Sequence, residues 1–93
     1  MQTIILPSES KEDKVWVDEM ALKLKADGTE GIIRPFYWMH WTDDNFKFDI
    51  QEKADLIAKH LRGEKARIIA KGEGLEIANL LKSMSPDQIV SIN

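Results

Sequence analysis

The sequence contains no cysteine, and its 93 residues include only three prolines and five glycines. Without thiols the chain has neither a disulfide framework nor a thiolate metal site. No apolar run approaches the roughly 20 residues that a membrane-spanning helix needs. The first residues, Met1-Gln2-Thr3, lack the positive charge that opens a secretory signal peptide. We therefore expect a cytoplasmic protein without a membrane partner.

An excess of positive charge is also missing. The chain has 13 Lys and Arg against 16 Asp and Glu, and the net charge of −3 gives no electrostatic footprint for nucleic acid. The 43% hydrophobic and 31% charged residues are typical of a globular protein rather than of a disordered one. The length predicts a single domain over residues 1–93.

The clearest local pattern lies in residues 66–81. An apolar run of strand length, Ile68-Ile69-Ala70, is broken by Gly72 and Gly74, and apolar residues then recur at helical spacing from Leu75 onward. A strand that leads through a tight turn into a helix is half of a β-α-β unit. It predicts parallel strands, with any site at the strand's carboxyl end.

The same alternation runs through the whole chain. Strands are expected over residues 3–6, 32–38, 66–70 and 89–92, and helices over about 10–26, 49–62 and 74–84. Ser10 and Asp49 are candidates to cap the first two helices. Gly28 and Gly63 are expected to end them.

The resulting order β-α-β-α-β-α-β predicts an α/β fold. We expect a three-layer αβα sandwich, with a four-stranded parallel sheet and three crossover helices. Helices cover both faces of such a sheet only if the winding reverses once, as it does in the strand order 2-1-3-4. Loops 7–14 and 71–74 would then flank a crevice between the first and third strands. The candidate crevice residues are Ser8, Ser10, Lys71, Gly72, Glu73 and Gly74.

Aromatic residues are concentrated in one segment, residues 36–48. This segment is expected to be an ordered loop pinned by aromatic packing. The alternative is an aromatic pocket at the carboxyl edge of the sheet, with Trp38, His40 and Trp41 as candidate residues. In either case Trp38, Trp41 and Phe46 are expected to be buried, because exposed they would form a large apolar patch.

Cofactor sites have weaker support. Gly72-Glu73-Gly74 at a helix start resembles a phosphate loop, but Ile77 stands where a dinucleotide fingerprint needs its third glycine. The carboxylates of Glu73 and Glu76 would also repel a phosphate. A metal shell would have to be built from three side chains of one loop, His40, Asp43 and Asp44. We expect no cofactor and no metal.

The order of elements resembles the central portion of the α/β-hydrolase family, from its third strand to its sixth. In that family a Gly-x-Ser-x-Gly turn carries the nucleophile. Here Ala70-Lys71-Gly72-Glu73-Gly74 matches that turn, and its nucleophile position is Gly72, which has no hydroxyl. Pro7-Ser8-Glu9-Ser10 falls where the family places its oxyanion-hole loop, but without the usual His-Gly. Ile33-Arg34-Pro35-Phe36-Tyr37 resembles the family's fourth strand.

The resemblance implies that Gly72 is held at strained backbone angles. It also argues against catalysis, because the family's acid and histidine lie on later strands, which would follow Asn93. We therefore expect a catalytically silent domain that resembles a truncated α/β-hydrolase core and acts through self-association.

Residues 89–92 would form an edge strand with apolar Ile89, Val90 and Ile92 and no lysine or proline to blunt it. A homodimer through this strand is expected. Two alternatives stay open. One is a flavodoxin-like module that binds a small ligand or phosphate in the crevice, and the other is a residual hydrolase that uses Glu73 or His40.

Overall fold

Four parallel strands form one sheet in the computed structural model, which describes residues 1–93. The strands are β1 (Gln2–Leu6), β2 (Ile33–Pro35), β3 (Ala66–Ala70) and β4 (Ile89–Ile92), and their order across the sheet is β2-β1-β3-β4. The helices are α1 (Asp13–Ala26), α2 (Ile50–Leu61) and α3 (Glu73–Met84), with a short 3₁₀ turn η1 (Met39–Trp41). The predicted three-layer fold and strand order are therefore confirmed.

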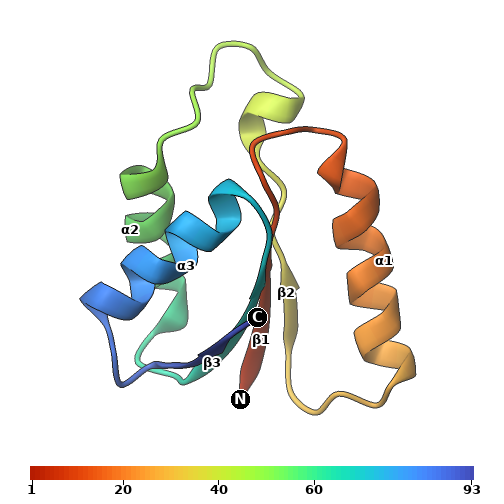
Figure 1. The fold of residues 1–93 in the computed structure, drawn as a ribbon, viewed down its shortest axis with the longest axis vertical. Coiled ribbons are helices and arrows are strands. Elements are labelled where there is room, and N and C mark those ends of the chain that lie inside the picture. The colour runs from red at the N-terminus through yellow and green to blue at the C-terminus, as the bar shows by residue number, and fades with distance from the viewer.

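The central strand β1 is buried along its whole length, as an apolar strand between two layers should be. Its side chains alternate between the two faces of the sheet. Ile4 and Leu6 belong to the main core beneath α2 and α3, whereas Ile5 points to the side of α1. Figure 1 shows α1 on one side of the sheet and α2 and α3 together on the other.

The main core lies between the sheet and the α2–α3 pair. Its twelve buried residues are Ile4, Leu6, Trp38, Ala54, Ile57, Leu61, Ala66, Ile68, Ile77, Ala78, Leu81 and Ile89. Most come from the apolar stripes of α2 and α3 and from the strand positions that face them. This core holds the carboxyl ends of β1 and β3 in place.

The helix ends agree with the sequence except at the start of α1. Asp49 caps α2, because its carboxylate accepts the backbone N–H of Glu52 at 3.2 Å. The predicted cap of α1 by Ser10 is wrong, since α1 begins at Asp13 without a side-chain cap. The Ser10 hydroxyl instead accepts the N–H of Glu12 in the preceding turn, and the Asp13 carboxylate is drawn back to Ser8.

The aromatic segment is only partly buried. The side chain of Trp38 is 4% exposed and its ring centroid lies 5.6 Å from that of Phe48, while Trp41 is half-buried. The predicted burial of Phe46 is wrong, because its side chain is 46% exposed. Phe46 closes a turn onto Asp43, in the part of the chain that arches beyond the sheet between η1 and α2 (Figure 1).

The half of the sheet formed by β3 and β4 has a helix on only one of its two faces. α1 packs on β1 and β2, whereas α3 packs on β1, β3 and β4. On the side of α1, Arg67 and Val90 are exposed and Ile69 is half-buried. We call Ile69, Val90 and the outer edge of β4 the open sheet face.

The longest helix, α1, has 14 residues. None of the helices combines the length and the apolar character needed to cross a lipid bilayer.

Candidate functional site

The carboxyl ends of β1 and β3 meet at the point where the strand order reverses, and two segments join there. One is the β1–α1 loop, residues 7–12, and the other is the turn from β3 into α3 around Gly72. The backbone of Gly72 has φ 56° and ψ −128°. Residues other than glycine rarely adopt these angles. The strained conformation predicted for Gly72 is therefore confirmed.

Gly74 allows α3 to start directly against the end of β1. A Cβ atom on residue 74 would lie 2.2 Å from the carbonyl oxygen of Leu6 and 2.7 Å from that of Pro7. The backbone N–H of Lys71 also donates to the Leu6 carbonyl at 3.1 Å. The two glycines thus bring the loop and the turn into contact.

Asp13 is the polar centre of this contact. It is buried, and its carboxylate accepts the backbone N–H of Ser8 at 2.9 Å and the Ser8 hydroxyl. Its other oxygen lies 3.2 Å from the Lys71 ammonium. Burial alone would raise the pKa of Asp13, but the bonds from Ser8 and the charge of Lys71 outweigh it and hold the pKa below the usual range.

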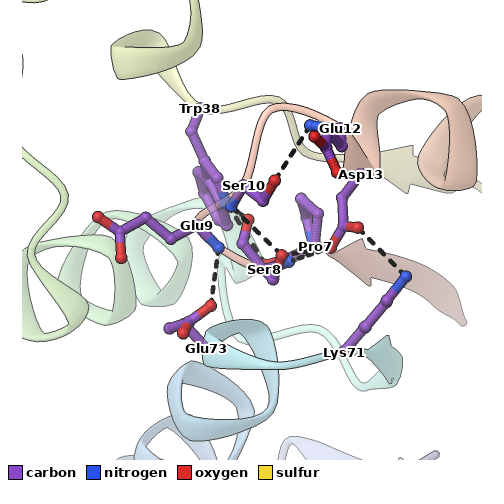
Figure 2. Close-up of polar contacts among 9 residues, drawn as sticks. All are labelled: Pro7, Ser8, Glu9, Ser10, Glu12, Asp13, Trp38, Lys71 and Glu73. Atoms are coloured by element: carbon purple, nitrogen blue, oxygen red, sulfur yellow. Dashed lines mark hydrogen bonds and ion pairs between the residues drawn. The ribbon is translucent and has the colours of Figure 1, made fainter.

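Glu73, the first residue of α3, bonds across to the loop. Its carboxylate accepts the backbone N–H of Glu9 at 2.9 Å (Figure 2). The pKa of Glu73 lies below its usual range because the N–H groups of Glu9 and of Glu73 itself stabilise the ionised form. The backbone donors that would receive an anion at this turn are therefore occupied by groups of the chain itself, either by the Glu73 carboxylate or by backbone carbonyls.

The aromatic segment holds the same loop from the other side. The indole N–H of Trp38 donates to the Ser8 carbonyl at 3.0 Å, and that of Trp41 donates to the Glu9 carbonyl at 2.8 Å. His40 Nε2 lies 2.7 Å from the Glu9 carbonyl. A carbonyl only accepts hydrogen bonds, so this nitrogen carries a hydrogen and donates. These three hydrogen bonds, together with aromatic packing, hold segment 36–48 against the loop.

The arrangement contains no hydroxyl bonded to an imidazole. Position 72 has no side chain, and the Ser8 hydroxyl donates to a carboxylate rather than to an imidazole. His40 has its Nε2 bonded to the loop and its Nδ1 buried without a partner. Lys71 is held by Asp13, and its ammonium also lies 5.5 Å from the centre of the Trp16 ring. Ser10 bonds only within its own turn.

The predicted crevice residues thus come together, but they bond to the chain itself. The aromatic segment, in contrast, borders an open cavity of about 310 Å³. Trp38 and Trp41 line it as predicted for an aromatic pocket, whereas His40 does not. The remaining lining residues are Lys11, Lys14, Tyr37, Met39 and Thr42.

Sequence reasoning missed three residues of the site. The sequence places Asp13 only at a helix start, Glu9 only in the loop after the first strand, and Tyr37 only in the second strand and the aromatic segment. The Tyr37 hydroxyl donates to Asp18 at 2.6 Å, and this bond, with some burial, raises the pKa of Tyr37 to about 12. A sequence signal existed for Asp13 alone, because a carboxylate at a helix start favours donors from the preceding loop.

No group of three or more His, Asp or Glu side chains in the structure is placed to hold a metal ion. Comparison of the chain with protein-family models, with curated proteins and with solved structures finds no match.

Proposed function

We propose that this chain is a catalytically silent α/β domain, similar in layout to an α/β-hydrolase core, that acts by associating with a second copy of itself. The open sheet face is the observation that carries the proposal. The cytoplasmic location expected from the sequence is part of it.

Catalytic silence is supported by the contents of the turn at Gly72. The residue at the apex has no hydroxyl, and the neighbouring donors and carboxylates are bonded to one another. A nucleophile needs a base within hydrogen-bond reach, and the Ser8 hydroxyl has only Asp13. We expect the protein to hydrolyse an activated ester such as p-nitrophenyl acetate no faster than a mixture of free amino acids. Turnover that is lost in His40→Ala or Glu73→Gln would instead identify a residual hydrolase.

Self-association is supported by the edge strand β4. It pairs with β3 on one side only, so its outer backbone groups meet no other strand of this chain. Val90 is 51% exposed and is the extra residue of a β-bulge between the pairs Ala66–Ile89 and Arg67–Ser91. Ile69, further along β3, is half-buried. Unpaired edges with apolar side chains are templates for pairing with another chain.

A twofold axis beside β4 would place two such edges antiparallel and join two sheets into one. The backbone donors and acceptors of both strands would be satisfied together, and Val90 of each copy would be covered. Pairing of β4 in one copy with β2 in the next would leave open ends, whereas the β4–β4 pair closes on itself, so the dimer is the expected product.

Sedimentation velocity from micromolar to submillimolar concentration tests this proposal. The wild-type protein should shift toward twice its 10.7 kDa mass, and Val90→Lys should remain a monomer, because a buried ammonium opposes the interface. Val15→Lys is the matched control, since Val15 is 62% exposed on the outer side of α1. It should associate like the wild type. A mass of 10.7 kDa for the wild type throughout, or an unchanged dimer in Val90→Lys, would contradict the proposal.

The small-ligand alternative is favoured by a separate observation, the open cavity beside the aromatic segment. The crevice that the sequence predicts for such a ligand contains Ser8, Ser10, Lys71 and Glu73, and there the side chains bond to the chain itself. The open cavity beside the aromatic segment is therefore the better candidate site for a small ligand.

A further inference from the structure

The cavity beside the aromatic segment has an apolar wall and a charged mouth. Tyr37, Trp38, Met39 and Trp41 form the wall, and Lys11 and Lys14 come from the turn before α1 and from its first turn. The volume of about 310 Å³ lies at the lower end of the range of about 300–1,000 Å³ for ligand pockets. It has room for a compact molecule of two or three rings.

The wall is held in place before any ligand arrives. Trp38 and Trp41 are fixed by their bonds to the Ser8 and Glu9 carbonyls. The Tyr37 ring is fixed by its hydroxyl on Asp18, and it meets the Trp41 ring edge to face at 6.5 Å. Rigid aromatic surfaces lose little conformational entropy when a flat ligand stacks on them.

The charge at the mouth is positive. Lys14 pairs with Asp18 at 2.9 Å, and Asp18 also accepts the Tyr37 hydroxyl, so this carboxylate is already neutralised and bonded. Lys11 makes no ion pair and no side-chain hydrogen bond. One ammonium group therefore remains without a counter-charge next to the aromatic wall.

We propose that this pocket binds a small planar aromatic anion, whose rings lie against Met39 and Trp41 while its acidic group pairs with Lys11. The proposal goes beyond self-association and does not depend on it, because the pocket and β4 are formed by different elements.

The test uses two dyes that differ by one acidic group. Anilinonaphthalene sulfonate carries a sulfonate, and phenylnaphthylamine has the same rings without it. Energy transfer from the tryptophans to each dye is followed in titrations of the full chain. We expect the sulfonate dye to bind at least several-fold more tightly than the neutral amine.

Three variants locate the bound dye. Met39 is 52% exposed, so Met39→Glu should leave the fold intact by circular dichroism. The same substitution should weaken binding of the sulfonate dye by about tenfold, which corresponds to a loss of about 1.4 kcal/mol in binding free energy. Lys11→Met removes the exposed ion pair proposed between Lys11 and the sulfonate, and it should weaken binding of the sulfonate dye by about two- to fivefold, without changing the affinity of the amine. Lys25→Met, an exposed change near the far end of α1, should have no effect.

Several results would overturn the proposal. Absence of saturable binding to the wild type would do so, as would unchanged dye affinity in Met39→Glu. Equal affinity for the two dyes, together with no effect of Lys11→Met, would show that the acidic group is not recognised. Loss of binding in Val90→Lys but not in Met39→Glu would place the dye on the open sheet face instead.

Discussion

A Cβ atom on residue 72 would lie 2.7 Å from the Cβ atom of Ser8. Carbon atoms of this kind do not approach so closely in folded proteins, and the backbone of Gly72 is in addition held at φ 56° and ψ −128°. Two independent constraints thus require glycine at the apex of the β3–α3 turn. One is the local backbone conformation, and the other is the packing of the loop that follows β1.

Gly72→Ala should destabilise the protein by about 1–3 kcal/mol from backbone strain alone, with a further cost from the contact with Ser8. Gly28→Ala is the control for a positive φ without a steric contact. Its φ is also positive, at 73°, but no atom lies within 4 Å of the added carbon, so about 1 kcal/mol is expected. Urea unfolding of both variants measures the difference. Equal losses would mean that neither the backbone conformation specific to Gly72 nor the contact with Ser8 adds a cost.

Asp13→Asn should lower the free energy of unfolding by about 1.5–3 kcal/mol at pH 7, the usual range for hydrogen bonds to a charged group. Both carboxylate oxygens of Asp13 face donors, so the NH₂ group of an amide at this position would face the donors of Ser8 or Lys71 without an acceptor. The pKa of Asp13 is lowered by folding, so its stabilising effect is complete above the unfolded pKa near 4 and is lost as the pH falls through the folded value. The difference between wild type and variant should therefore shrink below about pH 4.

Urea titrations of Asp13→Asn at neutral and acid pH provide the measurement. Asp44→Asn, an exposed change in the loop between η1 and α2, should follow the wild type at every pH. A deficit for Asp13→Asn that persists undiminished in acid would show that packing, rather than the charge, is what the residue supplies.

Tyr37 is the only tyrosine of the chain, so its ionisation can be followed by ultraviolet absorbance without interference. The bond to Asp18 raises its pKa to about 12, and at pH 11 the phenol should remain largely protonated. Asp18→Asn replaces the charged acceptor by a neutral amide, which favours the protonated phenol less, and ionisation should move back toward the ordinary value of about 10. Because folding raises this pKa, the linked stability is present below pH of about 10 and is lost as the pH rises toward the folded value. Titration near 10 in both proteins would disprove the contact.

Gln2→Met should stabilise the protein by about 1–2 kcal/mol, because a buried polar group without a partner costs about that much. The Gln2 side chain is 2% exposed, and neither its amide nitrogen nor its oxygen has a hydrogen-bond partner. Methionine has a similar length and no such requirement. The shift in the urea midpoint decides the matter, and a loss of stability would indicate that the amide of Gln2 is satisfied in solution.

The sequence contained enough information to predict the order of the sheet but not the bonds across it. Alternation of apolar strands and amphipathic helices is a local signal, and the reversal between β1 and β3 follows from covering both faces. The bond from Glu9 to Glu73 joins residues 64 positions apart, and no local pattern encodes it. Ser10 failed as a cap because Ser8 competes for Asp13, and Phe46 failed because the chain around it turns outward.

The position of β1 in the sheet has a consequence for folding. It pairs with β2 on one side and with β3 on the other, and Gln2 lies opposite Ala66. β1 precedes β3 by about 60 residues of chain, so its second set of partners is available only after a long loop closes, and that closure costs entropy before any contact compensates. Folding should accordingly be slower than that of a helical bundle of the same length. The β1 amide hydrogens should exchange with solvent only through complete unfolding.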